Sequence, residues 1–131
     1  MAVSTELQYA SVDELFLDPW NPRLGHEKIE EHLSQAEILE IMRDWKPEEL
    51  AVSYLEGGGF WPQEALLVVQ EEVGGEDRLV VVEGNRRLAA LLLLRDAFFN
   101  PEEAPAKFRR IAEGSDPPEG LFQRVPYLEI D

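Results

Sequence analysis

Two adjacent arginines, Arg86 and Arg87, follow Gly84 at a junction between a predicted strand and a predicted helix. The four preceding residues, 79–82, are apolar, which suits a buried strand, and the Leu/Ala run over 88–94 favours a helix. Free backbone N–H groups and the helix dipole would point the same way as the guanidinium groups. The junction therefore indicates an anion site, for phosphate or carboxylate; alternatively, both arginines pair with acidic residues of the chain.

The net charge of the 131-residue chain is −15, from 27 acidic and 12 basic side chains. This charge opposes strong binding of DNA by the chain alone, because such affinity comes largely from neutralising phosphates. The segment 84–95 differs from the rest, since it carries three arginines and no acidic residue. A positive spot in an acidic surface favours a small anionic ligand over a long polyanion.

Composition predicts one folded domain over residues 1–131, because hydrophobic residues make up 44% of the chain. The absence of cysteine excludes disulfides, thiolate metal sites and thiol catalysis. The apolar run over 88–94 is too short to span a membrane, and residues 1–8 do not resemble a signal peptide. We therefore expect a cytoplasmic protein with no membrane partner.

The elements that position the two arginines follow from residue patterns in the rest of the chain. One or two short strands are predicted over 8–17, a hairpin over 66–71 and 78–82, and a last strand over 124–130. Helices are predicted over 34–45, 47–56, 85–99 and 105–112. These elements predict an α+β fold with a small mixed β-sheet and several flanking helices.

Two prolines, Pro19 and Pro22, give the segment 18–23 an extended or turning path. Such a rigid segment would present Asn21 and Arg23 accurately to a ligand, although a plain surface turn is equally compatible with it. The glycine-rich loop 57–63 likewise has a ligand-binding and a purely structural interpretation.

The loop 57–63 carries two aromatic residues, Phe60 and Trp61. Their rings would either stack on a base or cover the core.

His26 and His32 stand near three glutamates, Glu27, Glu30 and Glu31. The two histidines are six residues apart, a spacing that does not place them on one helical face as metal ligands. A solvated charged segment is favoured over a metal site here, and no metal ligand is assigned.

Five short motifs occur in an order that resembles the ParB/sulfiredoxin fold, in particular the ParB-like N-terminal domain, also described as the ParB-like nuclease domain. The resemblance covers nearly the whole chain. The motifs are Asn21-Pro22-Arg23, Gly59 followed by Pro62, the strand Leu66 to Val69, Glu83 to Ala90 after the hairpin, and the strand Val125 to Ile130.

The resemblance implies that a nucleotide binds at the 84–87 turn, since the ligand is CTP in ParB partition proteins and ATP in sulfiredoxin. A nucleoside triphosphate with Mg²⁺ is therefore the expected cofactor. By position, the phosphate-binding residues are Gly84, Asn85, Arg86 and Arg87, with Asn21 and Arg23 lining the same cleft. The base and sugar side is assigned to Gly59, Phe60, Trp61 and Gln63.

Two departures from the family pattern argue against catalysis. ParB members carry Glu where this chain has Asn85 and a third Arg where it has Ala89. Because the family Glu is associated with triphosphate hydrolysis, hydrolysis is not expected. The sulfiredoxin cysteine would also fall at Asn85, which excludes that reaction. Catalytic residues stay unassigned, and Glu27, Glu30 and Glu31 are the candidates if the chain were a kinase of this fold.

The leading hypothesis is a nucleotide-binding ParB-like domain that serves as a regulatory or DNA-associated module of a larger protein. Its expected partners are a nucleotide, DNA through regions outside this chain, and a second copy of the chain as a further option. One alternative is a direct DNA-binding or nuclease-type ParB-like protein. Another is a non-catalytic acidic protein-interaction module in which the arginines form internal ion pairs.

Overall fold

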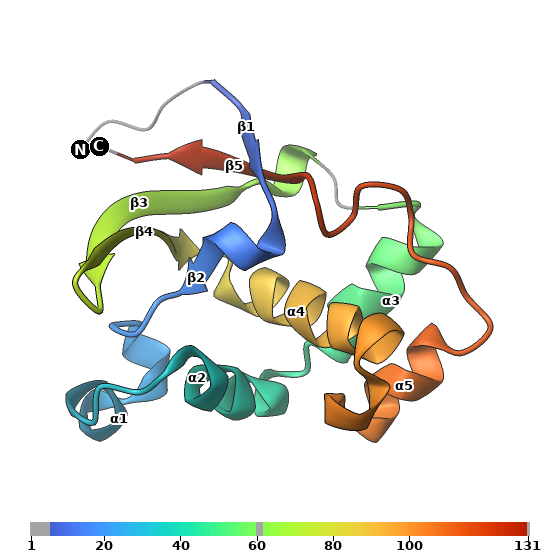
Figure 1. The fold of residues 1–131 in the computed structure, drawn as a ribbon, viewed down its shortest axis with the longest axis horizontal. Helices are drawn as coiled ribbons and strands as arrows, with labels where there is room; N and C mark the ends of the chain where they lie inside the picture. The colour runs from blue at the N-terminus through green and yellow to red at the C-terminus, as the bar shows by residue number, and fades with distance from the viewer. Residues whose placement is uncertain (1–5, 60–61, 131) are drawn as a thin grey trace.

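A five-stranded mixed sheet forms one layer of the molecule, and the helices lie on one side of it (Figure 1). The computed structural model describes residues 6–59 and 62–130. The strand order is β1-β5-β3-β4-β2, in which β2 runs parallel to β4 and β5 runs parallel to β3. The β1–β5 and β3–β4 pairs are antiparallel. The chain is thus a mixed α/β protein, as the sequence predicts.

The predicted hairpin is present, and its strands are longer than expected. Only Gly74 and Gly75 form the turn, with φ of 64° and 85°. Two positive φ values in succession match the tight hairpin turns that glycine favours, so pairing continues to the turn itself. The strands are β1 (Gln8–Ala10), β2 (Leu15–Leu17), β3 (Leu66–Val73), β4 (Glu76–Glu83) and β5 (Val125–Glu129).

The helices begin and end close to where their sequence signals lie. Ser34 Oγ accepts from the Glu37 backbone N–H at 3.2 Å, and the Glu37 carboxylate accepts from the Ser34 N–H at 3.0 Å. This capping box starts the second helix. The helices are α1 (His26–Glu30), α2 (Gln35–Met42), α3 (Glu48–Glu56), α4 (Asn85–Phe99) and α5 (Ala106–Ala112). Short 3-10 turns are η1 (Val12–Glu14), η2 (Pro22–Leu24), η3 (Arg43–Trp45), η4 (Pro62–Glu64) and η5 (Pro101–Glu103).

Helix α4 lies at the centre of the core, against the sheet and between the other helices (Figure 1). Its small residues Ala89 and Ala90 are fully buried, as are Leu88, Leu91 and Leu94 around them. A helix that is apolar on nearly every side must be enclosed by other elements. This burial fixes the position of the α4 N-terminus relative to the sheet.

Strand β5 lies inside the sheet, and its proline occupies a position that the pairing tolerates. Pairing of β5 with β3 begins at Tyr127, one residue after Pro126. The missing N–H of Pro126 therefore falls where the β3 ladder has not yet begun. In the described part of the chain, no helix is long and apolar enough to cross a membrane.

Candidate functional site

An open cleft of about 600 Å³ lies beside the start of α4, and we call it the arginine cleft. Four segments far apart in sequence meet there: the turn at Asn21–Arg23, the helix ends near Trp45 and Leu50, η4 at Glu64, and residues 82–87. The lining residues are Asn21, Pro22, Arg23, Trp45, Leu50, Glu64, Val82, Glu83, Gly84, Asn85, Arg86 and Arg87.

Gly84 ends β4 and precedes the first turn of α4. Its φ of 102° lies in the region that glycine adopts without strain, and it lacks a side chain that could cap the helix. A Cβ at this position would stand 2.5 Å from Leu66 Cδ2 and 3.2 Å from Arg87 Cζ. Since no side chain caps α4, the N–H groups of its first turn have neither an intrahelical nor a capping partner beside the cleft.

Arg87 is the arginine whose guanidinium lies closest to this turn. Its Nη2 would be 3.2 Å from a Cβ at Gly84, and its Nη1 donates to the backbone carbonyl of Glu64. The side chain is half-buried, and no carboxylate forms an ion pair with it in the part of the chain that the structure describes. One edge of the Arg87 guanidinium is therefore held by protein, while its charge remains available to an anion.

Arg86 is bound mainly to the protein itself. Its Nε donates to the Trp45 carbonyl and its Nη2 to the Lys46 carbonyl, both at 2.6 Å. Nη2 also lies 3.1 Å from the Glu49 carboxylate. Carbonyls at the end of a helical segment lack intrahelical partners, so Arg86 supplies the hydrogen-bond donors for the carbonyls at the end of η3. Its charge reaches the cleft, and its Nε and Nη2 donate to acceptors of the protein.

Asn85 is 5% exposed, and its side chain is bonded internally. Its Oδ1 accepts from the Asp18 backbone N–H at 2.9 Å, and its Nδ2 donates to the Val81 carbonyl at 2.8 Å. Asn85 thus contributes its backbone N–H to the helix start, while its amide holds neighbouring segments together.

The turn at 21–23 is ordered by its own hydrogen bonds. Asn21 Oδ1 accepts from the Arg23 backbone N–H at 3.0 Å and caps η2. The Arg23 guanidinium lies over the Trp45 ring, with Cζ 4.0 Å from the ring centroid. The structure brings Asn21 and Arg23 together with the 84–87 turn, although about sixty residues separate them. Stacking on Trp45 holds the exposed Arg23 side chain at the cleft wall.

Two carboxylates also line the cleft, those of Glu64 and Glu83. Below them, burial raises the pKa of the Tyr54 hydroxyl well above its usual value, so this phenol stays protonated at neutral pH. In the described part of the chain no group of three or more acidic or histidine side chains is arranged to hold a metal ion. A divalent cation would therefore need oxygens from a ligand as well as from these two glutamates.

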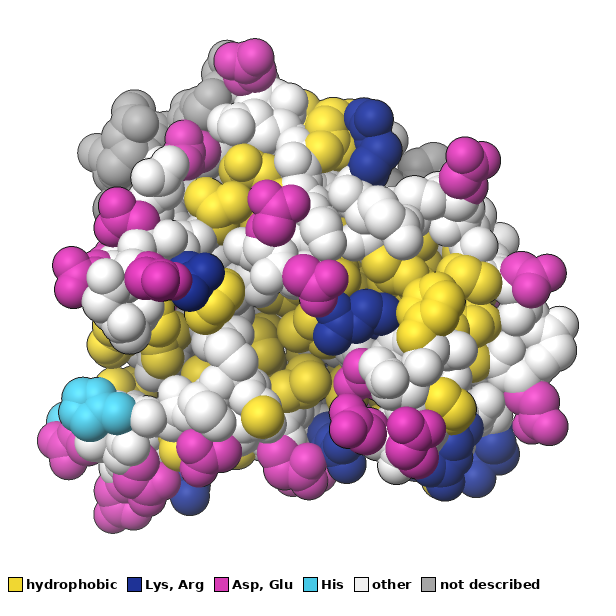
Figure 2. All heavy atoms as spheres, in the orientation of Figure 1, with side chains coloured by type: hydrophobic (Ala, Val, Ile, Leu, Met, Phe, Trp, Pro, Cys, Tyr) yellow, Lys and Arg dark blue, Asp and Glu magenta, His cyan; other side chains and the backbone are white. Residues whose placement is uncertain are grey.

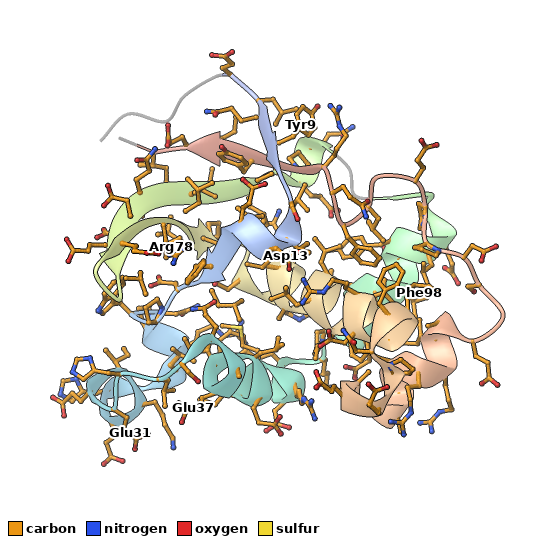
Figure 3. All side chains as sticks on the ribbon, in the orientation of Figure 1. Tyr9, Asp13, Glu31, Glu37, Arg78 and Phe98 are labelled. Atoms are coloured by element: carbon orange, nitrogen blue, oxygen red, sulfur yellow. The ribbon has the colours of Figure 1, made fainter. Side chains whose placement is uncertain are left out.

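The third arginine of the segment 84–95 lies away from the cleft. Arg95 pairs with Asp13, which is labelled in Figure 3, and its Nη2 lies 3.7 Å from Asp96. The positive charge of the cleft thus comes from Arg23, Arg86 and Arg87.

Two of the residues assigned to a base and sugar, Gly59 and Gln63, do not line the arginine cleft. Gly59 donates its N–H to the Tyr54 carbonyl at 2.8 Å, and a Cβ added at Gly59 would lie 3.9 Å from Pro118 Cβ. Gln63 is exposed on η4 and is absent from the cleft lining. Phe60 and Trp61 lie outside the described residues. Among the described residues, Trp45, Leu50 and Val82 contribute apolar side chains to the cleft wall.

The polar segment around α1 is solvent-exposed. His26 Nε2 lies 2.9 Å from Glu30, and both side chains are largely exposed. Glu27 and Glu31 are exposed as well, and none of the three glutamates lines the cleft. The structure therefore gives these glutamates no place beside a ligand at the 84–87 turn.

Sequence reasoning did not assign five residues of the cleft wall to the site: Trp45, Leu50, Glu64, Val82 and Glu83. Trp45, Leu50 and Val82 occupied apolar positions of predicted helices or strands, while Glu64 and Glu83 were two acids among many. Glu83 had one usable signal, its place directly before Gly84.

The chain matches no family model, no curated protein sequence and no solved structure.

Proposed function

We propose that this chain is a nucleotide-binding domain with a ParB/sulfiredoxin-like fold, which holds the phosphates of a nucleoside triphosphate at the 84–87 turn. The observation that carries the proposal is the convergence of Arg23, Arg86 and Arg87 on the open end of α4 in a chain of net charge −15. A helix N-terminus beside arginines favours a compact polyanion. A cleft of about 600 Å³ is of the size that small-molecule ligands occupy.

In the proposed complex, the open N–H groups of α4 and the guanidinium of Arg87 bind phosphate oxygens. Arg23 also lines the cleft and supplies further charge, while Arg86 contributes mainly its charge because its Nε and Nη2 are engaged by carbonyls. Glu64 and Glu83 would repel a bare triphosphate. A Mg²⁺ ion bound with the triphosphate would offset that repulsion, and Glu64 or Glu83 would help to hold it, so binding should depend on Mg²⁺.

The proposed role is binding rather than catalysis, and it suits a regulatory or DNA-associated module of a larger protein. The residue that stands where relatives of the proposed fold carry Glu or Cys is Asn85, and its amide is occupied by Asp18 and Val81. It offers no base or nucleophile to a phosphate. Nucleotide exchange, without turnover, is then the expected chemistry.

Isothermal titration of the chain with CTP, ATP, GTP and ADP, each with and without Mg²⁺, tests the proposal. At least one triphosphate should give saturable heat, and it should bind more tightly with Mg²⁺. The Arg87→Gln variant should bind at least about tenfold more weakly, as expected for loss of a charge-assisted hydrogen bond. Arg110→Gln is the matched control, because it removes the same charge from the exposed face of α5.

Absence of binding by every nucleotide at about 1 mM would contradict the proposal. Equal loss of affinity in Arg87→Gln and Arg110→Gln would show that only the overall charge matters, which also contradicts a site at the 84–87 turn.

A further inference from the structure

The face of the sheet opposite the helices carries an apolar row. Along β3 and β4, Leu66, Val68 and Val81 belong to the main core, whereas the alternate residues Val69 and Val80 do not. Val80 stands beside Val69 in β3 and beside Phe16 in β2. On the same face of β4, Val80 is 1% exposed and Val82 is 38% exposed. The outward residues are Phe16, Leu67, Val69, Val80, Val82 and Leu128.

This pattern differs from that of a sheet with one solvated face. A strand that is covered on one side alternates apolar and polar residues, while a continuous apolar run is typical of strands covered on both sides. Residues 66–69 and 79–82 are continuous apolar runs. Among the described residues, however, the helices cover only one side of the sheet (Figure 1). The outward face therefore has the composition of an interface.

A pocket of about 280 Å³ opens on this face, and we call it the Trp20 pocket. Its apolar wall is made of Val69, Val80 and Val82, and the Trp20 side chain, 48% exposed, flanks it. Two acidic residues complete the lining, Asp18 and Glu71. An apolar channel that ends in carboxylates suits a long side chain with a cationic tip.

Asp18 is 9% exposed, and its carboxylate lacks a cationic partner. Oδ1 accepts from the Trp20 backbone N–H at 2.9 Å, and within the described residues no lysine, arginine or histidine forms an ion pair with Asp18. Burial raises the pKa of this carboxyl, and the charge of Glu71 raises it further. Buried carboxylates are normally paired with a cationic group. The Asp18 carboxylate therefore gives the pocket a negative charge that a cationic ligand could neutralise.

The nearest candidate for an internal partner is engaged elsewhere. Arg78 stands opposite Glu71 in the β3–β4 register, on the hairpin where Figure 3 labels it. Its guanidinium pairs with Glu76 and lies over the Phe16 ring, with Cζ 5.0 Å from the centroid. Glu71 is thus left facing the pocket together with Asp18.

We propose that the Trp20 pocket receives an arginine side chain from a basic, apolar segment of a partner protein that docks on the open face of the sheet. The arginine stem packs against Val69 and Val82, its planar tip stacks on Trp20, and its guanidinium binds Asp18 and Glu71. The flanking apolar residues of the segment cover the outward row of the sheet.

Charge selects this occupant over two others. The chain carries −15, and on the face shown in Figure 2 acidic side chains outnumber basic ones. The hairpin beside the pocket adds Glu71, Glu72, Glu76 and Asp77. A second copy of the chain would place like charges together, and a nucleic acid would be repelled. A basic segment is attracted by the same field.

The test is a nuclear magnetic resonance titration with the tripeptide Ac-Leu-Arg-Leu-NH₂, compared with Ac-Leu-Cit-Leu-NH₂, in which neutral citrulline replaces arginine. The arginine peptide should give saturable shifts of the Trp20 indole N–H and of the Val69, Val80 and Val82 methyls. The citrulline peptide should bind at least about tenfold more weakly than the arginine peptide, because it lacks the positive charge that pairs with the carboxylates. Ac-Leu-Lys-Leu-NH₂ should lie between them, since ammonium does not stack.

Two variants distinguish a pocket from general attraction to an acidic protein. Asp18→Asn keeps the acceptor for the Trp20 N–H but removes the buried charge, and should weaken the arginine peptide about tenfold. Glu113→Gln removes one negative charge from the exposed end of α5 and should change nothing. Arg87→Gln should also bind the peptide normally, which separates this pocket from the nucleotide proposal.

Three results would overturn the inference. They are absence of localised, saturable shifts at about 20 mM arginine peptide, equal binding of the citrulline peptide, and unchanged affinity in the Asp18→Asn variant. The variant's own spectrum reports whether it is folded, so each result can be read without assuming that the substitution is tolerated.

Discussion

The side-chain oxygen of Asn85 accepts a hydrogen bond of 2.9 Å from the backbone N–H of Asp18, across 67 residues of sequence. The Asn85 amide nitrogen donates to the Val81 carbonyl at 2.8 Å. One buried side chain therefore joins the start of α4, the end of β4 and the turn that carries Asn21 and Arg23. The shape of the arginine cleft depends on this junction.

Replacing Asn85 with alanine should destabilise the protein. The substitution leaves the Asp18 N–H and the Val81 carbonyl without their partner in a buried place, which should lower the free energy of unfolding by roughly 2–3 kcal/mol. Urea denaturation followed by tryptophan fluorescence measures the change. Asn100→Ala, at an exposed position, is the control and should stay within about 0.5 kcal/mol of the parent. Equal effects of the two substitutions would mean that Asn85 does not join these segments.

Replacing Arg86 should affect mainly stability, whereas replacing Arg87 should affect mainly nucleotide binding. Arg86→Ala removes the donor to the Trp45 and Lys46 carbonyls and should lower the free energy of unfolding by roughly 1–3 kcal/mol. Arg87→Ala removes one hydrogen bond to Glu64 and should cost about 1 kcal/mol or less. Nucleotide affinity should show the reverse order, with the greater loss at Arg87. Thermal unfolding and isothermal titration of both variants make the comparison; the same order in both measurements would contradict the assignment.

Gly84→Ala should be much more damaging than the same change in the hairpin turn. At Gly84 the new Cβ meets Leu66 Cδ2 at 2.5 Å in addition to the cost of φ 102°. At Gly75, with φ 85°, a Cβ meets nothing within 4 Å, so only the backbone cost remains. We expect roughly 1 kcal/mol for Gly75→Ala and about 2 kcal/mol more for Gly84→Ala. Chemical denaturation of the pair gives the difference, and equal losses would contradict the close packing of Leu66 on the 84–87 turn.

The strand, turn and helix from 79 to 94 could be predicted because their signals are local. A run of β-branched residues, one glycine and a run of helix formers each favour their element regardless of what surrounds them. The mixed sheet also follows from the count and spacing of such elements. The Leu/Ala content of 88–94 is in keeping with burial of α4 on more than one face.

The roles of the site residues could not be predicted, because they depend on which distant segments meet. The partners of Arg86 are carbonyls at Trp45 and Lys46, about forty residues away, and no pattern in the sequence marks a carbonyl as unpaired. From the sequence, Asn85 could equally bind a ligand or hydrogen-bond two segments of the chain, and only the position of Asp18 beside it decides between these roles. The continuous apolar runs of β3 and β4 predicted buried strands, and only the topology reveals that one face is left open.

Asp18 should make stability depend on pH in a specific direction. Its carboxyl pKa is raised in the folded state, mainly by burial, so folding favours its protonated form. The resulting stabilisation is complete below the unfolded pKa and is lost as the pH rises through the folded pKa. Asp18→Asn mimics the protonated group at every pH. The variant should therefore be more stable than the parent at pH 7, with a difference that shrinks toward zero near pH 4 and below.

Denaturation of parent and variant at several pH values between about 3.5 and 7 measures this difference. Glu113→Gln provides the baseline, since its exposed carboxyl should give a difference that does not change with pH. A variant that is less stable than the parent at pH 7 would mean that the buried Asp18 charge is stabilised by the fold, contrary to the pocket described above.

Gln35 protects the exposed edge of the sheet. Strand β2 is an edge strand, and the Gln35 side chain on α2 accepts from the Leu17 N–H at 2.7 Å and donates to the Leu17 carbonyl at 2.9 Å. It thus takes the place of a neighbouring strand. Gln35→Ala should lower the free energy of unfolding by roughly 1–2 kcal/mol. It should also promote association, because an unpaired edge is a template for strand pairing.

Light scattering over a range of protein concentrations measures the association of Gln35→Ala, with Gln123→Ala at an exposed loop position as the control. Gln35→Glu sharpens the test. Glutamate keeps the acceptor for the Leu17 N–H, loses the donor to the Leu17 carbonyl and adds a charge that repels a second copy. This variant should be destabilised like alanine yet stay monomeric at the same concentrations. If alanine and glutamate associate equally, the edge of β2 is not where the molecules meet.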